Sequence, residues 1–300
     1  MTNRKINFRP LAFLLAFCLV HVAGAEEKRD TAAAHHSLWK IKGPRNEVYL
    51  LGSVHVLKKE DYPLPAVIES AFTNAGVVAF ETDLEALENP ATAMKLMTKA
   101  RLPEGETLQQ QLKPEVYEQL NKHLKDAGLQ PEMFNQLSAP MAAIALALVE
   151  FQKMGLDPEY GVDKHFFELA RKANKQIIPL ETVDFQIGLL TDFTKDEGNL
   201  LLKATLKDLD SLKTDFGDLV KAWKTGDTTK LGKFLNEAME EAPVIFKRLV
   251  TNRNRNWLPK IEELTRGEKN AIVIVGAGHL IGKEGVMELL KEKGLKVTQE

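Results

Sequence analysis

Short apolar runs of four or five residues recur along this chain of 300 residues, with long stretches of helical periodicity between them. The runs at 48–51, 77–80, 177–180 and 271–275 have the length and composition of buried strands. A fifth run, at 38–41, alternates apolar and polar residues and is joined to the first by a turn, which predicts a hairpin. Strands separated by helices indicate an α/β fold.

Helical periodicity dominates two long stretches, at 84–155 and 185–265. Within the first stretch, residues 141–151 are apolar almost all round, which predicts a buried helix. Along the second, lysines and acidic residues interleave, as is typical of solvated helix faces. We therefore expect helices to flank the sheet and to form an insertion beside it.

A polar residue closely follows each of the four buried strands. Two strands end in Gly-x-x-His and two end in Glu-Thr. The sequence thus contains two pairs of similar strand ends, which indicates internal similarity. In an open α/β sheet, ligands bind beyond the carboxyl ends of the strands. Two imidazoles and two carboxylates there are costly to bury unless they pair or bind something. The sequence thus predicts one shared site, formed by His55, Glu81, Glu181 and His279.

The first 25 residues are typical of a secretory signal peptide. Three positive residues precede a short apolar run at 11–20, and the small residues at 23–25 form a cleavage pattern ending at Ala25. The alternatives are less favoured. A membrane anchor needs more apolar residues than this run contains, and a lipoprotein signal centred on Cys18 needs a small residue where Phe17 stands.

We therefore expect a signal peptide at 1–25, a flexible leader at 26–36 and one domain at 37–300, in a periplasmic or secreted protein. Cleavage removes three positive charges and no acid, which changes the formal net charge from −2 to −5. An acidic surface does not favour nucleic-acid binding. Cleavage also removes the only cysteine, so any metal must be held by His, Asp and Glu. No later apolar run is long enough for stable membrane insertion.

Several motifs, in order along the chain, resemble the TraB/GumN/PrgY family. They are Leu38-Trp39-Lys40-Ile41, the segment 49–55, Tyr62-Pro63-Leu64-Pro65, the segment 80–83, Gly161-Val162-Asp163, Leu180-Glu181-Thr182, Arg253-Asn254 followed by Trp257, and the segment 275–280. Family members often have Thr where this chain has Ser53. The animal relatives are the TIKI proteases, and the wider fold group includes erythromycin esterases and ChaN-like haem-binding proteins.

The resemblance implies an erythromycin-esterase/ChaN-like (EreA/ChaN-like) α/β fold, with an internally duplicated β-sheet core, flanking helices and a helical insertion. The similarity to the TIKI proteases implies a metal-dependent hydrolase of peptide bonds, which is the activity we expect of this chain. His55, Glu81 and His279 are then the metal ligands, and Glu181 is a second carboxylate ligand or the general base. Arg253 or Asn254 would bind the developing oxyanion. The roles of the two glutamates are interchangeable at this stage.

The implied cofactor is a divalent ion of the manganese or cobalt type. Imidazole and carboxylate donors also suit zinc and iron. Two alternatives stay open. The resemblance to esterases suggests a metal-independent hydrolase, in which a His–Glu pair activates water against a small ester. The resemblance to haem-binding and pheromone-regulating proteins suggests a protein that sequesters a peptide or haem without turnover.

Overall fold

The computed structural model describes residues 35–209 and 212–300. The predicted signal peptide, and all but the last two residues of the predicted leader, lie outside the described residues. Among the helices of the described part of the chain, none is long and apolar enough to cross a membrane.

The core of the fold is one mixed sheet with the strand order β4-β3-β5-β2-β1-β6. The central pairs β4–β3, β3–β5 and β5–β2 are parallel, whereas β1 is antiparallel to both of its neighbours. The hairpin predicted at the start of the domain is confirmed as β1 and β2. The strands are β1 (Leu38–Lys42), β2 (Glu47–Ser53), β3 (Val77–Phe80), β4 (Gln176–Pro179), β5 (Ala271–Gly276) and β6 (Val297–Gln299).

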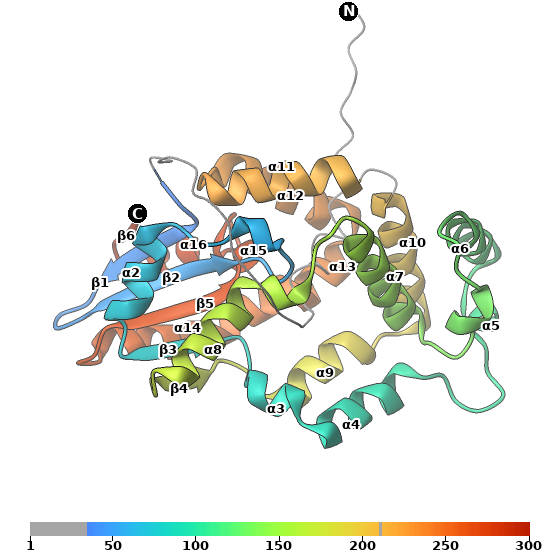
Figure 1. The fold of residues 1–300 in the computed structure, drawn as a ribbon, viewed down its shortest axis with the longest axis horizontal. Helices are drawn as coiled ribbons and strands as arrows, with labels where there is room; N and C mark the ends of the chain where they lie inside the picture. The colour runs from blue at the N-terminus through green and yellow to red at the C-terminus, as the bar shows by residue number, and fades with distance from the viewer. Residues whose placement is uncertain (1–34, 210–211) are drawn as a thin grey trace, which may run out of the picture.

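Helices cover the sheet and extend beyond one end of it. Figure 1 shows α2 and α8 in front of the sheet and α14 behind it, with α5, α6, α7 and α10 gathered beyond the carboxyl ends of the strands. The bounds are α2 (Ala66–Asn74), α3 (Leu84–Glu88), α4 (Pro90–Ala100), α5 (Leu108–Gln111), α6 (Pro114–Asp126), α7 (Ala139–Lys153), α8 (Val162–Lys172), α9 (Val183–Thr191), α10 (Lys195–Leu209), α11 (Leu212–Lys224), α12 (Thr228–Glu241), α13 (Pro243–Phe246), a π-helical turn (Lys247–Thr251), α14 (Asn252–Arg266), α15 (Ala277–Leu280) and α16 (Val286–Glu292).

The α/β class and the buried helix predicted at 141–151 are confirmed. Helix α7 spans that segment and packs against α10, with Ala142, Ala143 and Leu146 wholly buried. The finer expectation of an erythromycin-esterase/ChaN-like, internally duplicated core stays a prediction. For the site, the important feature is that β4, β3, β5 and β2 are parallel neighbours, because their carboxyl ends then meet at one edge of the sheet.

Gly52 lets the end of β2 approach the short helix α15. A Cβ atom at this position would lie 2.9 Å from the Cβ and 3.0 Å from the Cα of Ala277. Both distances are shorter than van der Waals contact. This glycine therefore allows a close approach of two backbone segments.

The Gly52→Ala variant is expected to lower the free energy of unfolding by about 1–3 kcal/mol, because the added methyl group overpacks this contact. Chemical or thermal denaturation measures the change. Gly217→Ala is the matched control, since nothing lies within 4 Å of a Cβ added to this α11 residue. The control is expected to be at least as stable as the native protein. Equal stability of the Gly52→Ala variant would show that β2 and α15 separate at no cost.

Candidate functional site

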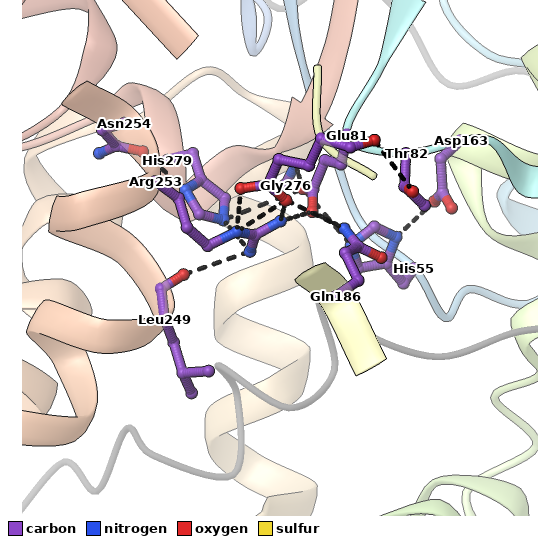
Figure 2. Close-up of polar contacts among 11 residues, drawn as sticks. His55, Glu81, Thr82, Asp163, Gln186, Leu249, Arg253, Asn254, Gly276 and His279 are labelled. Atoms are coloured by element: carbon purple, nitrogen blue, oxygen red, sulfur yellow. Dashed lines mark hydrogen bonds and ion pairs between the residues drawn. The ribbon is translucent and has the colours of Figure 1, made fainter. Parts of the chain in front are cut away.

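The four strand-end residues predicted from the sequence meet at the carboxyl edge of the sheet. Glu181 follows β4, Glu81 follows β3, His279 lies in α15 just after β5, and His55 follows β2. All four residues are buried, with at most 8% of their surface exposed. Figure 2 shows Glu81 and both histidines pointing toward one another across the strand ends. The parallel order of the strands is what brings them together.

Arg253, near the start of α14, joins the two glutamates. Its Nη2 donates to Glu81 Oε2 at 2.6 Å and to Glu181 Oε2 at 2.8 Å, and its Nε donates to Glu181 Oε1 at 2.9 Å. The guanidinium also lies 4.9 Å from the ring centre of Trp257. Arg253 is only 2% exposed. The arginine is therefore an internal counter-charge for two buried carboxylates.

Glu81 is held in its ionised form. Burial alone would raise its pKa, but the Arg253 guanidinium, the two histidines and the backbone N–H of Gly276 outweigh burial and lower the pKa to about 2. The Gly276 N–H donates to Glu81 Oε1 at 2.8 Å. One carboxylate oxygen thus faces Arg253, whereas the other faces the backbone of β5 and the histidines.

Each histidine is oriented by a polar partner on its Nδ1 atom. His55 Nδ1 lies 2.6 Å from Asp163 Oδ1, and His279 Nδ1 lies 2.7 Å from Asn254 Oδ1. The Asn254 amide donates its Nδ2 to the carbonyl of Glu284, which assigns its oxygen to the histidine. Because the partner of each Nδ1 is an acceptor, Nδ1 carries the proton in the neutral ring, and the Nε2 lone pair is directed to the centre of the site.

Both Nε2 atoms lie 3.9 Å from the same oxygen, Glu81 Oε1. His279 Nε2 also accepts a hydrogen bond from Arg253 Nη1 at 3.1 Å. The two rings differ in their ionisation. Burial and the nearby Arg253 charge lower the pKa of His279 to about 3. For His55, burial favours the neutral ring, but Asp163 and Glu81 outweigh it and raise the pKa.

The donor set fits a divalent ion, although the described residues contain no group of three His, Asp or Glu side chains already arranged to hold one. Two imidazole nitrogens and a carboxylate oxygen are ligands that such ions accept, with bonds of about 2.0–2.2 Å. Two ligands of one ion are then no more than about 4.4 Å apart, and the 3.9 Å separations are within that limit. Arg253 Nη1 would have to give up its contact with His279.

A pocket opens onto this centre, and part of its space is continuous with solvent. Its polar end includes His55, Glu81, Asp163 and Arg253. Its other walls are largely apolar and come from α3, α9 and the π-helical turn. The reactive groups are therefore buried but reachable from one side.

The structure places two further residues at the site, Asp163 and Gln186. Asp163 belongs to a motif of the predicted family, but its contact with His55 spans 108 positions of the chain. Gln186, on α9, has its Nε2 3.4 Å from both Glu81 Oε2 and Glu181 Oε2. Asn254 contacts His279 Nδ1. The expectation that Arg253 or Asn254 binds the oxyanion stays a prediction.

Comparison with known proteins adds relatives of two kinds. The uncharacterized protein YbaP of Escherichia coli (strain K12) is 26% identical over 243 residues, covering 81% of this chain and 87% of that protein. Metalloprotease TIKI2 of Danio rerio is 24% identical and covers 87% of this chain and 60% of its own length. Metalloprotease TIKI1 of Homo sapiens is 23% identical, with 92% and 64% covered. No solved structure matches this chain.

The family comparison covers almost all the described residues. A sequence model of the TraB/PrgY/gumN family matches residues 37–299, which include every strand of the sheet and all the residues of the site. The match agrees with the family expected from the motifs. The chain belongs to the TraB/PrgY/gumN family.

Proposed function

We propose that this protein is a metal-dependent hydrolase of peptide bonds, in which His55, Glu81 and His279 hold a divalent ion. The observation that carries the proposal is the convergence of both Nε2 atoms on one oxygen of Glu81. The opposite ring nitrogen of each histidine, Nδ1, contacts a side-chain oxygen of Asp163 or Asn254. A histidine oriented by a carboxylate or amide in this way is the usual arrangement of a metal ligand. The related TIKI proteins, which are named metalloproteases, support the same reaction class.

The charges of the site also favour a bound cation. The centre contains three carboxylates, those of Glu81, Asp163 and Glu181, and one guanidinium, that of Arg253, which pairs with the two glutamates. These four groups sum to two negative charges. The raised pKa of His55 favours a protonated ring, which would still leave one negative charge without a counter-charge in a largely buried centre. Burial of unpaired charge is costly, and a divalent ion would balance it. Such an ion would supply Lewis acidity toward water and toward a carbonyl oxygen.

The protein side chains divide the other tasks. Glu181 uses both of its oxygens to hold Arg253, so we assign Glu181 to positioning the arginine and Glu81 to ligation. Arg253 Nη1 donates to the Leu249 carbonyl oxygen at 3.2 Å and to His279 Nε2 at 3.1 Å. An ion held by His279 Nε2 would release the second of these N–H groups, which could then donate to a substrate carbonyl oxygen as negative charge develops on it. Asp163 fixes the tautomer and orientation of His55.

One observation favours a metal-independent version of the same hydrolase. The hydrogen bond from Arg253 Nη1 occupies His279 Nε2, one of the three donors that the ion needs. In that version the pair of Asp163 and His55, linked at 2.6 Å, takes a proton from water directly, and Arg253 stabilises the oxyanion. The substrate would again be a carbonyl compound, with small esters included.

Metal analysis separates the two versions. Protein purified without a metal-affinity tag is expected to contain about one divalent ion per chain, and the variants His55→Ala, Glu81→Gln and His279→Ala are expected to contain much less, because each lacks a ligand. His123→Ala is the control, since this half-buried histidine on α6 contacts Glu150 instead. Complete chelation is expected to abolish peptide hydrolysis, and added manganese or cobalt to restore it. Hydrolysis that survives chelation would establish the metal-independent version.

We also propose that the protein acts outside the cytoplasm. The support is the sequence of residues 1–25, with its positive start, its short apolar run and its small residues before position 26. Amino-terminal sequencing of the protein after expression with its leader tests this: a mature chain starting near Glu26 is expected. An intact amino terminus would contradict export by a cleaved signal peptide.

A further inference from the structure

Leucines from two helices supply part of the apolar lining of the pocket. Leu84 and Leu87 lie on α3, and Leu189 and Leu190 lie on α9; we call these four the leucine walls. Leu84 and Leu189 are buried, whereas Leu87 and Leu190 are only partly buried. The partly buried pair therefore offers apolar surface to the pocket, which a ligand can cover.

The walls are tied to the reactive centre by the local sequence. Helix α3 begins three residues after Glu81, and its N-cap Asp83 accepts from the backbone N–H of Ala86. Helix α9 begins two residues after Glu181, and its N-cap Thr182 accepts from the backbone N–H of Phe185. Each glutamate thus leads through a capped turn into a helix that lines the same pocket. The apolar surface lies directly beside the groups proposed to act on the substrate.

The distance between the two helices is also constrained. Helix α4 follows α3 with Asn89 between them, and two of its lysines contact α9. Lys95 pairs with Asp184 at 2.7 Å, and Lys99 pairs with Asp192 at 3.0 Å. These ion pairs are exposed and individually weak, but together they link the outer sides of α3–α4 and α9. Figure 1 shows α3, α4 and α9 lying together below the strand ends.

The chemistry of the leucine walls decides what kind of side chain they accept. The four leucine side chains carry no positive charge and no hydrogen-bond donor, so an acidic side chain placed against them would lose its hydration without gaining a partner. An uncharged apolar side chain covers the leucines without any such cost.

We propose that the leucine walls form a specificity subsite for an uncharged apolar side chain in a peptide held across the His55–Glu81–Arg253 centre. The inference rests on the proposed function for its substrate class. It adds the kind of peptide side chain that is recognised and the residues of the protein that recognise it.

Binding of a matched peptide series tests the subsite apart from hydrolysis. The probes are blocked, fluorescently labelled pentapeptides, Ala-Ala-Xaa-Ala-Ala, in which Xaa is Gly, Leu or Asp and the two amide bonds that flank Xaa are N-methylated to resist cleavage. Fluorescence anisotropy with the purified protein measures each Kd. The leucine peptide is expected to bind about 10- to 100-fold more tightly than the glycine peptide, because one aliphatic side chain becomes buried. The aspartate peptide is expected to bind most weakly.

A charge placed on one wall is expected to reverse this preference. The Leu87→Lys variant should lose most of the leucine-over-glycine ratio and bind the aspartate peptide more tightly than the glycine peptide. Misfolding would weaken the binding of all three peptides alike and would produce no such reversal. Met94→Lys is the control, because it makes the same charge change on the exposed face of α4, where Met94 is 71% exposed.

The outcomes for the subsite and for the proposed function are distinct. Equal binding of the leucine and glycine peptides by the native protein, or an unchanged ratio in the Leu87→Lys variant, would overturn the subsite. So would the absence of measurable binding for every peptide. Hydrolysis of the unmethylated series, measured separately, decides whether the protein is a peptidase.

Discussion

The His55→Ala and His279→Ala variants are each expected to lower kcat/KM for peptide hydrolysis by about 1000-fold or more. Removal of a proton-transfer group costs about 100- to 10,000-fold, and loss of a metal ligand also removes the Lewis acid. Both rings have Nε2 3.9 Å from Glu81 Oε1, so either substitution dismantles the same centre. Initial rates with a cleavable peptide measure the effect.

His123→Ala is again the matched control and is expected to keep the native rate, since His123 lies on α6 and contacts Glu150. Circular dichroism melting curves of all three variants separate a loss of activity from a loss of fold. If either active-site variant retains more than a tenth of the native kcat/KM, the corresponding histidine is not part of the reaction.

Replacement of Arg253 by alanine is expected to lower the free energy of unfolding by about 3–5 kcal/mol. The substitution leaves Glu81 and Glu181 buried at 8% exposure without the guanidinium that both accept from. For a chain of this size the loss corresponds to a decrease in Tm of roughly 10 °C. Arg253→Lys retains the positive charge but lacks the planar set of N–H donors of the guanidinium. A smaller decrease in the free energy of unfolding is therefore expected than for Arg253→Ala.

Arg255, two residues further along α14, provides the comparison. Its side chain is 61% exposed and pairs with Glu284 at 2.9 Å. An exposed pair of this kind contributes about 0–1 kcal/mol, so Arg255→Ala is expected to melt close to the native protein. Similar melting temperatures for Arg253→Ala and Arg255→Ala would show that the two glutamates do not depend on Arg253 for their burial.

The parts of this structure that the sequence could predict are those set by local patterns. The run at 271–275 is apolar at every position and became the wholly buried strand β5. Residues 141–151 are apolar around the helix, and they lie in the buried helix α7. The four strand-end residues could be placed in one site, because an α/β sheet gathers the carboxyl ends of its parallel strands.

The parts that could not be predicted depend on contacts between distant segments. Arg253 was expected to face the substrate, but nothing in its neighbourhood indicates that it binds Glu81, 172 positions away, and Glu181, 72 positions away. Likewise, Gln186 lies in an ordinary helical pattern, and only the packing of α9 against the strand ends brings its amide near both carboxylates. Local periodicity carries no information about such pairings.

The position of β5 has a consequence for how the chain acquires its structure. This strand is a middle member of the sheet, between β3 and β2, yet it comes from the last tenth of the sequence. Until residues 271–276 are available, β3 and β2 have no common partner, and the earlier part of the chain cannot join its two halves into one sheet. Pairings at such long sequence separation slow folding. The sheet therefore closes only after the last tenth of the chain has arrived, and a chain that ends before residue 271 is expected to lack the joined sheet.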